Sequence, residues 1–600
     1  MSDALQYEID LSHRDQHLVT VTLTVPADLS AGARLYLPTW TPGSYVMRDY
    51  VHHMQSITAT DDDGAVELEL SGHTGWRVAD DVRGPLIVTY ELYANELTVR
   101  TNHVDDHHAL LVGAATFVLV EGARHRAHDV RILVPDGQRA WALLPGEDGR
   151  FRADDADHLV DSAFEVGDFP TVTCDVRGVT HTFVWAGHGG APDLDRISRD
   201  LALTAEAAVD LFEGDLPVER YTFLCVGWDE GGGGLEHRDG AVLMMPVTTF
   251  QDPDTYARFQ SLIAHEYLHL WNVKRLTPQE LVEPDFVGHT HSRMLWVAEG
   301  WTAYYDELLP VRAGVWDLER FFKTLGRQLD AVLDRPGAAY QSLEESSYHA
   351  WTKQYIRDEN SLNNGVDYYG HGAVVAWCLD LRVRRSRTGS PGLDQALHSL
   401  WQQFGASGTG FTDDDVRKAV SAAAGEDLGE FFDRHVRGRE PPPIEDLIRV
   451  VGLQITRPVP DEGATPWFGT EVAETDRGIT VTAVHRNGPA WSAGLTGSDE
   501  LLAVDGQTVR RGQLDGILRR YAAGNTVEVV VRRGPRVVTR TVTLGEPRPP
   551  RKVVAVEHAT ADQAAAFLAW TGQPHPAVLV PPDTPTAPQD AGTHDAAQDE

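Results

Sequence analysis

The sequence predicts a multidomain α+β protein: an N-terminal antiparallel β-sandwich-like domain, a mainly helical middle domain and a smaller β module. Three observations predict this class. The chain has 600 residues, which is enough for several domains. Apolar residues alternate with polar ones toward both ends of the chain, and in the middle they recur with the period of a helix. Hydrophobic residues (42%) and charged residues (24%) occur in globular proportions, so most of the chain is expected to fold.

The β-sandwich-like domain is expected over residues 1–170. Along residues 19–25, apolar side chains alternate with threonines, as in a strand with one buried face. Similar runs occur at 86–97 and 116–120, separated by turns rich in Gly, Asp and Pro. The aromatic segment 40–50 is interpreted as a packed turn in preference to a wall of a substrate site.

The middle domain is expected over residues 171–440, with a small sheet before the helices. Four consecutive glycines, Gly231 to Gly234, interrupt it and indicate a turn or a close approach of the backbone. Three prolines from Pro441 mark its end. The expected helices are 197–212, 256–273, 295–309, 318–333 and 372–385.

The β module is expected over residues 441–548 and a C-terminal extension over 549–600. Strands are predicted at 479–484, 526–533 and 536–544, with a helix at 512–521. The last ~20 residues are rich in Pro, Asp, Ala, Gln and Thr, a composition that cannot form a core, so they are predicted to be a disordered tail.

The composition excludes several functions. Lys and Arg total 52 against 89 Asp and Glu, a net charge of −37, which disfavours nucleic acid and anionic membrane partners. The three cysteines show no paired spacing, the first residues lack a signal peptide, and no run approaches the ~18 apolar residues of a membrane span. A cytoplasmic protein is predicted; the sequence leaves its oligomeric state open.

A metal site is predicted in the helical run 256–273. In His265-Glu266-Tyr267-Leu268-His269, the histidines are four residues apart, so on a helix they lie on one face and can bind one ion. In this arrangement the imidazoles bind Zn²⁺ and the glutamate takes a proton from water on the metal. Glu299, an acid within an apolar and aromatic run, is the candidate third ligand, because burial of an unpaired carboxylate is costly. Helix histidines satisfied by other contacts are the alternative.

These residues resemble a known family. The run 265–275, with Glu299-Gly300-Trp301-Thr302 downstream, is similar to the glycyl aminopeptidase family of gluzincin metallopeptidases. Further similarities lie at 38–45, 233–237 and 368–372, so the resemblance covers most of the chain. It implies a thermolysin-like catalytic domain and a zinc aminopeptidase that prefers small N-terminal residues, Gly or Ala.

The resemblance also implies roles for substrate-binding residues. Glu236 would bind the free α-ammonium group of a peptide, for which a carboxylate is the natural partner, and the backbone at Gly233 and Gly234 would approach the substrate. A surface loop with an incidental acid is the alternative. Tyr369 would donate to the oxyanion, with its neighbour Tyr368 as the rival and a packing tyrosine as the alternative.

The β module resembles a bacterial-type PDZ domain through residues 487–495 and 499–506. Such a domain would bind the C-terminus of a peptide, with Trp467-Phe468-Gly469 as the carboxylate loop and 512–521 as the groove helix. Alternatively, the module only braces or shades the catalytic domain.

The overall prediction is a zinc-dependent aminopeptidase acting on peptides. A zinc endopeptidase with substrates selected by the PDZ-like module and a non-catalytic peptide-binding scaffold with structural zinc are the alternatives. Among the remaining polar residues, Asn272 is interpreted as a support for the metal ligands or a helix cap. The cluster His103, Asp105, Asp106, His107 and His108 is interpreted as a solvated turn, and His289 and His291 as loop residues.

Overall fold

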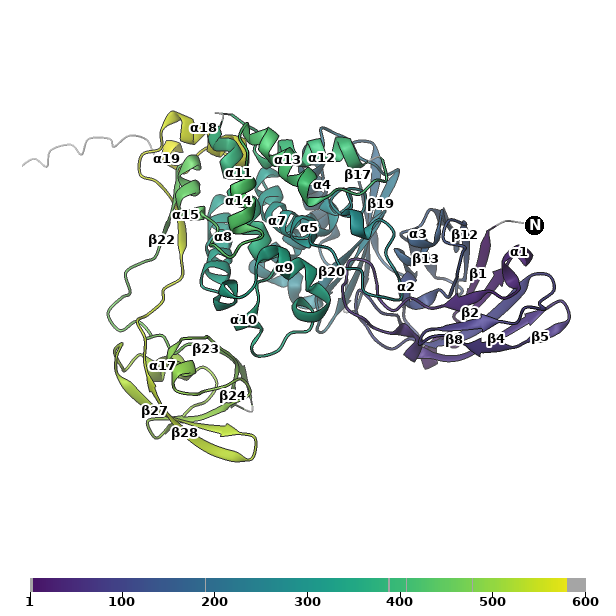
Figure 1. Ribbon diagram of the computed structural model, residues 1–600, viewed down its shortest axis with the longest axis horizontal. Coiled ribbons are helices and arrows are strands. Elements are labelled where there is room, and N and C mark those ends of the chain that lie inside the picture. Colours follow the sequence, from purple (N-terminus) through teal and green to yellow (C-terminus); the bar gives the residue numbers. More distant parts are fainter. Residues whose placement is uncertain (1–3, 189, 387–388, 406, 477, 580–600) are drawn as a thin grey trace, which may run out of the picture.

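The computed structural model describes residues 4–188, 190–386, 389–405, 407–476 and 478–579. Figure 1 shows three regions in chain order: a β domain around the N-terminus, a central region of sheet and helices, and a small β domain that projects from the far side of the helices. The predicted disordered tail, the last ~20 residues, lies outside the described residues.

The N-terminal domain is built on one large sheet and two small ones. The large sheet has the order β14-β15-β12-β1-β2-β8-β4-β5, with all neighbours antiparallel except β1 and β12, which are parallel. Val19, Val21, Leu23 and Val25 of β2 are completely buried, which confirms the predicted alternation. The strand predicted at 116–120 is mostly wrong, because the helical turn α2 (Gly113–Thr116) precedes a strand of only two residues, β11 (Leu119–Val120).

The bounds of the large sheet are β14 (Gly146–Glu147), β15 (Arg150–Ala153), β12 (His128–Leu133), β1 (Leu5–Asp10), β2 (Leu18–Val25), β8 (Leu86–Tyr93), β4 (Met54–Asp61) and β5 (Gly64–Val66). The small sheets are β13 (Arg139–Ala142), β16 (Ala163–Gly167), β10 (Ala109–Val112) and β9 (His103–Val104), and β11, β3 (Arg34–Tyr36), β7 (Gly75–Val78) and β6 (Leu68–Leu70).

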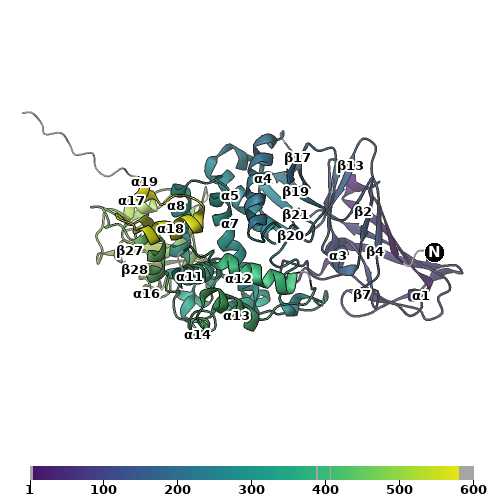
Figure 2. The same ribbon diagram turned by 90° about the horizontal axis from the view of Figure 1, so that it is seen from above.

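The middle domain begins with a sheet in the order β17-β18-β19-β21-β20, in which β20 is an edge strand. Helices then pack against this sheet and against one another (Figure 2). The strands are β17 (Thr171–Val176), β18 (Val179–Gly187), β19 (Arg220–Trp228), β20 (Gly233–His237) and β21 (Gly240–Pro246). The longer helices are α4 (Leu194–Asp210), α5 (Pro253–Leu268), α7 (Gly300–Arg312), α8 (Leu318–Leu333), α11 (Gly370–Ser386) and α13 (Asp413–Ala424).

One helix ends earlier than the sequence predicts. The run 256–273 is helical only to Leu268, because the backbone turns away and reaches a φ of +103° at Val273. The predicted helix 295–309 is interrupted once, at Glu299, between α6 (Leu295–Ala298) and α7. Shorter helices complete the domain: α9 (Leu343–Tyr348), α10 (Ser361–Asn364), α12 (Leu393–Leu400), α14 (Gly429–His435) and α15 (Ile444–Leu447).

The end of the middle domain lies beyond the prolines that the sequence suggests as its boundary. Ile444, Leu447 and Val451 are buried in the same core as the helices of the middle domain, so the predicted start of the β module at 441 is too early. The core of the module contains residues from Phe468 to Leu544. Its elements are β23 (Thr470–Thr475), β24 (Gly478–Val484), β25 (Glu500–Val504), α17 (Leu514–Leu518), β27 (Thr526–Arg533) and β28 (Arg536–Thr543).

The β module is connected at both ends through a pair of strands. β22 (Leu453–Thr456) precedes it and β29 (Lys552–Ala555) follows it, and the two pair antiparallel beside the helices. The chain then forms α18 (Ala561–Thr571), in which Trp570 is completely buried and its Nε1–H donates to the Tyr304 hydroxyl at 2.8 Å. The first part of the predicted extension therefore belongs to the core of the middle domain.

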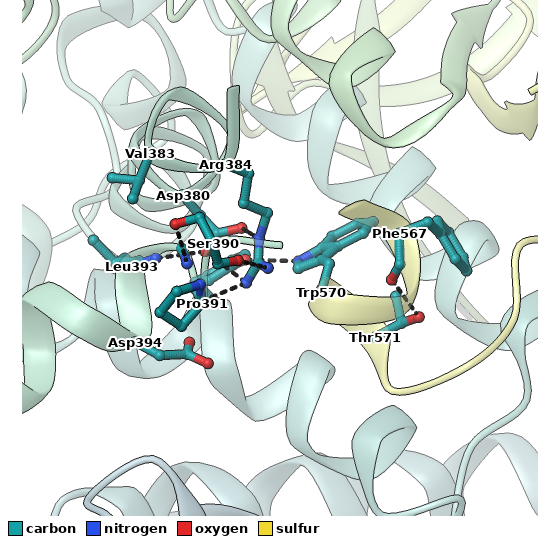
Figure 3. Close-up of polar contacts among 12 residues, drawn as sticks. Asp380, Val383, Arg384, Ser390, Pro391, Leu393, Asp394, Phe567, Trp570 and Thr571 are labelled. Carbon is teal, nitrogen blue, oxygen red and sulfur yellow. Dashed lines mark hydrogen bonds and ion pairs between the residues drawn. The ribbon is translucent and has the colours of Figure 1, made fainter. Parts of the chain in front are cut away.

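Figure 3 shows this docking site, with Trp570, Phe567 and Thr571 beside the end of α11. There the buried Arg384 guanidinium pairs with Asp380 at 2.6 Å and donates to the backbone oxygens of Ser390 and Pro391.

Among the described residues, no helix has the length and hydropathy needed to cross a bilayer.

Candidate active site

Helix α5 places two histidines on one face. Asp252 caps its first turn by accepting from the backbone N–H groups of Asp254 and Thr255. One turn apart near its end, His265 and His269 have ring centroids 4.7 Å apart. Glu299 approaches from the next helical segment, and its Oε2 lies 3.4 Å from Nε2 of His265 and 3.3 Å from Nε2 of His269. The three predicted ligands therefore point to one position.

The other ring nitrogen of each histidine is also held. Nδ1 of His265 lies 2.8 Å from Oδ2 of Asp306, and Nδ1 of His269 lies 2.8 Å from the backbone oxygen of Asn272. Partners of this kind fix the ring orientation of metal-binding histidines. The early end of α5 makes the second contact possible, because a continued helix would keep the Asn272 carbonyl in the helical ladder. The Asn272 side chain donates to Val297, Ala298 and Thr302, so it supports the next helix and does not cap α5.

The electrostatics of this cluster suit a cation. Burial alone would raise the pKa of Glu299, but the adjacent His269 and His265 lower it to about 2. Burial opposes protonation of both histidines, yet the acidic partners raise their pKa values. Two imidazoles and a carboxylate converging in a buried position form the donor set that zinc prefers. The residues present therefore fit a zinc ion.

Glu266 borders this position without a partner of its own. Its Oε2 is buried and has no hydrogen bond among the described residues, and burial raises its pKa to about 7. Gly234 on β20 lies directly against it: a Cβ there would be 2.2 Å from Oε1 of Glu266. The glycine run thus allows the close backbone approach that the sequence indicates.

Glu236 lies on the same edge strand and is 4% exposed. Its Oε1 is 3.5 Å from Nζ of Lys274, which also pairs with Asp161 at 2.8 Å. Burial disfavours the charged lysine, but Asp161 and Glu236 raise its pKa, so the ammonium persists. Gly43, from the N-terminal domain, covers the carboxylate so closely that a Cβ would lie 2.4 Å from Oε1.

Two consecutive tyrosines differ in their surroundings. Tyr369 lines the cavity beside the ligands, with its ring 6.2 Å from that of His265, and its hydroxyl lies 2.8 Å from the Tyr355 hydroxyl. Tyr368 is completely buried, and its hydroxyl has no partner among the described residues. Of the two, Tyr369 is therefore the one placed to reach a substrate.

These residues surround one cavity of about 310 Å³. It is lined by Gly43, Arg100, Gly234, Leu235, Glu236, Arg258, Ser261, Leu262, His265, Glu266, His269, Glu299, Asp306 and Tyr369. Arg100 also donates to the backbone oxygen of Gly234 at 3.3 Å. The arrangement offers a metal position, a base, a hydroxyl donor and a carboxylate within a single site.

Several residues of this site escaped the sequence analysis. Asp306 lies seven residues after Glu299, two turns along the same helix face, and this spacing could have identified it. Lys274, Asp161 and Tyr355 carry no such signal, because only the fold brings them to Glu236 and Tyr369 at the edge of the site.

The remaining sequence interpretations have mixed outcomes. The segment 40–50 is a packed turn, with Trp40 1% exposed, but it also supplies Gly43 to the cavity. His289 and His291 lie outside helices and strands, as predicted. The solvated turn predicted for residues 103–108 is confirmed for Asp106 and His107, which are exposed, and is wrong for His103 and His108, whose rings are buried against each other.

Comparison with known proteins identifies three matching families. The M61 glycyl aminopeptidase model matches residues 258–375, the peptidase M61 N-terminal domain model residues 6–168, and the PDZ domain model residues 466–544. No curated protein sequence matches the chain. A crystal structure of an aminopeptidase N family protein from Idiomarina loihiensis is similar over 94% of this chain and 100% of its own, with 29% identity and a TM-score of 0.89. An M1 zinc metallopeptidase from Deinococcus radiodurans matches 73% of this chain and 94% of its own, with 16% identity and a TM-score of 0.46.

Proposed function

The chain belongs to the M61 glycyl aminopeptidase family, and we propose that it is a zinc-dependent aminopeptidase that removes the N-terminal residue of peptides. In this proposal His265, His269 and Glu299 bind the zinc ion. The observation that carries it is the position of Glu236, a buried carboxylate in the same cavity as the ligands. An enzyme that cuts only at a free N-terminus needs such a group, and one that cuts inside chains does not.

When bound, zinc would act as a Lewis acid toward the scissile carbonyl and water. Glu266 takes a proton from the attacking water and passes it to the leaving amine. The absence of a hydrogen-bond partner at its buried Oε2 supports this role, because that oxygen is free to accept a proton. The Tyr369 hydroxyl donates to the oxyanion of the tetrahedral intermediate.

Glu236 binds the α-ammonium group of the substrate through a charge-assisted hydrogen bond. Lys274 contacts its Oε1, and Oε2 is the oxygen that we assign to the substrate. Gly233 and Gly234 belong to the edge strand β20, so a peptide can lie beside them as an added strand. Arg100 holds the carbonyl of Gly234 and thereby positions this strand.

Three finer parts of the proposal come from the sequence. We propose a preference for Gly or Ala as the first residue, a cytoplasmic location, and binding of a peptide C-terminus by the PDZ domain.

Asn363 in α10 donates to the backbone oxygen of Val484 and accepts from the backbone N–H of Arg486, both at 2.8 Å. The PDZ domain is thus also attached to the catalytic domain.

The test is hydrolysis of aminoacyl p-nitroanilides and of matched N-acetylated peptides, with and without a zinc chelator. We expect chelator-sensitive cleavage confined to free N-termini, with the highest rates for Gly or Ala. Glu236→Gln should lower kcat/KM by about 10- to 100-fold, the value of a charge-assisted hydrogen bond. Glu230→Gln, which replaces an exposed carboxylate in the turn before β20, is the matched control and should have no effect.

Other outcomes would contradict the proposal. Cleavage of blocked peptides that is insensitive to Glu236→Gln would identify an endopeptidase. A folded, zinc-loaded protein without any hydrolysis would indicate a peptide-binding scaffold.

A further inference from the structure

A second group of metal-type side chains lies in the N-terminal domain, apart from the catalytic cavity. It is formed by the turn between β9 and β10, where Nδ1 of His103 lies 2.8 Å from Nε2 of His108. One ligand atom each from His103, Asp105 and His108 lies within 4.8 Å of the others. The two histidines are 7% and 2% exposed, so their rings are buried, while Asp105 is partly buried beside them.

Two members of the group, Asp105 and His108, are held in place by further hydrogen bonds. Oδ1 of Asp105 accepts from the backbone N–H groups of His107 and His108, both at 2.8 Å, which leaves its other oxygen available to a ligand. Nδ1 of His108 lies 2.8 Å from Oε1 of Glu165, which is completely buried on the neighbouring strand β16. Because Nδ1–H donates to this carboxylate, Nε2 of His108 presents its lone pair to His103.

The catalytic site of the same molecule has an equivalent arrangement. There, His265 faces its ligand position with Nε2, while its Nδ1 is held by the carboxylate of Asp306, also at 2.8 Å. A carboxylate behind a histidine is the usual support of a metal-binding imidazole. The pair Glu165 and His108 therefore repeats, in the N-terminal domain, the local geometry of the proposed zinc ligand His265 and its partner Asp306.

Charge balance distinguishes a metal from a shared proton. The cluster contains two carboxylates, Asp105 and Glu165, and among the described residues His108 is the one ion-pair partner of Glu165. Oε2 of Glu165 is buried without a hydrogen bond from any described residue. One proton between the two rings would leave a net negative charge in a buried site, which is costly, whereas a divalent cation would neutralise both carboxylates.

We propose that His103, Asp105 and His108 bind a second divalent metal ion, of the class of Zn²⁺, with Glu165 orienting His108. Two imidazoles and one carboxylate suit zinc and related transition metals. The ion would be held by the β9–β10 segment, which the contact between His108 and Glu165 connects to β16. The Trp228 ring from β19 of the catalytic domain packs over both histidines, with centroid distances of 5.6 and 6.2 Å, so the site lies at the contact between the two domains.

The test is the metal content of the full-length protein. After loading with Zn²⁺ and dialysis, we expect two equivalents per chain in the wild type, one in His269→Ala, one in His108→Ala and none in the double variant. His107→Ala is the matched control: this adjacent histidine contacts Phe169 and His188, and its loss should leave two equivalents.

A milder variant guards against misfolding of His108→Ala. Asp105→Asn keeps an oxygen for the two backbone N–H groups but loses the charge, and it should weaken binding of the second Zn²⁺ by at least about tenfold in a Co²⁺ competition titration. A single equivalent in the wild type that disappears in His269→Ala would overturn this inference while leaving the aminopeptidase proposal intact. Two equivalents of unchanged affinity in Asp105→Asn would also overturn it.

Discussion

At the scale of single residues, the site depends on which of two neighbouring groups faces the cavity. Tyr368 and Tyr369 stack on each other with centroids 4.8 Å apart, and they have the same side chain. Their hydroxyls differ: that of Tyr369 contacts Tyr355 and reaches the cavity, while that of Tyr368 is enclosed. The role of each tyrosine therefore depends on the direction in which its side chain points, and the sequence alone does not give that direction.

Replacement of each tyrosine by phenylalanine tests this assignment. Tyr369→Phe should lower kcat by about 10²- to 10³-fold with little change in KM, because a donor to the oxyanion acts in the transition state. Tyr368→Phe is the matched control, removes a hydroxyl that has no partner among the described residues, and should retain kcat. The reverse order in steady-state kinetics would assign the donor to Tyr368.

A second residue-scale prediction concerns acid stability. His128 in β12 is 1% exposed, neither ring nitrogen has a hydrogen bond among the described residues, and burial lowers its pKa from 6.5 to about 4. Above pH 6.5 the His128 ring is neutral in both the folded and the unfolded protein. As the pH falls toward 4, only the unfolded chain takes up the proton, so this residue should cost about 3 kcal/mol of stability.

His128→Leu should remove that contribution. Measured by thermal unfolding at pH 7.5 and at pH 4.5, the variant should lose less stability than the wild type over this interval. Equal losses in the two proteins would show that His128 is not a source of the acid sensitivity.

Residue-scale prediction from the sequence succeeded where spacing carried the information. His265, His269 and Glu299 do converge, because a helix brings residues four apart onto one face and buried acids need a partner. Lys274 and Asp161 could not be found in this way, because they are 113 positions apart and meet only through the tertiary fold.

At the scale of elements, the segment 40–45 of the N-terminal domain forms part of the active site. Gly43 has a φ of +88° and lies against Glu236, so the conformation and the contact both require glycine. The sequence analysis favoured a packed turn for this segment, and its aromatic residues are packed, but the function is carried by the glycine between them. Helix cores were likewise predicted better than helix ends, since α5 stops at Leu268 where His269 needs the Asn272 carbonyl.

Gly43→Ala should raise KM for free N-termini at least tenfold, because the added Cβ displaces the Glu236 carboxylate. The control is Gly122→Ala, which has a similar φ of +82° with no atom within 4 Å of the added Cβ. It reproduces the backbone strain of about 1 kcal/mol without the contact. Equal kinetic effects in both variants would remove Gly43 from the binding site.

At the scale of the whole molecule, the catalytic core is completed by residues on both sides of the PDZ domain. The prolines at 441–443 suggested a boundary. The core is instead completed by the pairing of β22, which precedes the PDZ domain, with β29, which follows it. Sequence composition identifies the module and not its points of attachment, because pairing of strands that lie about a hundred residues apart leaves no local pattern. The PDZ match over residues 466–544 agrees with the compact core of the module.

The stability of the catalytic domain should therefore depend on α18. Trp570→Ala should destabilise the protein by about 3–5 kcal/mol, as expected for a completely buried tryptophan. Leu568→Ala, on the exposed side of the same helix at 50% exposure, should change the stability by well under 1 kcal/mol. If chemical denaturation gave similar values for both, α18 would not be part of the cooperative core.

The central claim is that Glu266 is the base of a zinc-dependent peptidase, and Glu266→Gln tests it most directly. Zinc content and turnover of an aminoacyl p-nitroanilide should be measured on the same preparation. We expect zinc content equal to that of the wild type and a loss of kcat of at least about 10²-fold, the contribution of general base catalysis. Wild-type turnover in the zinc-loaded variant would contradict the mechanism.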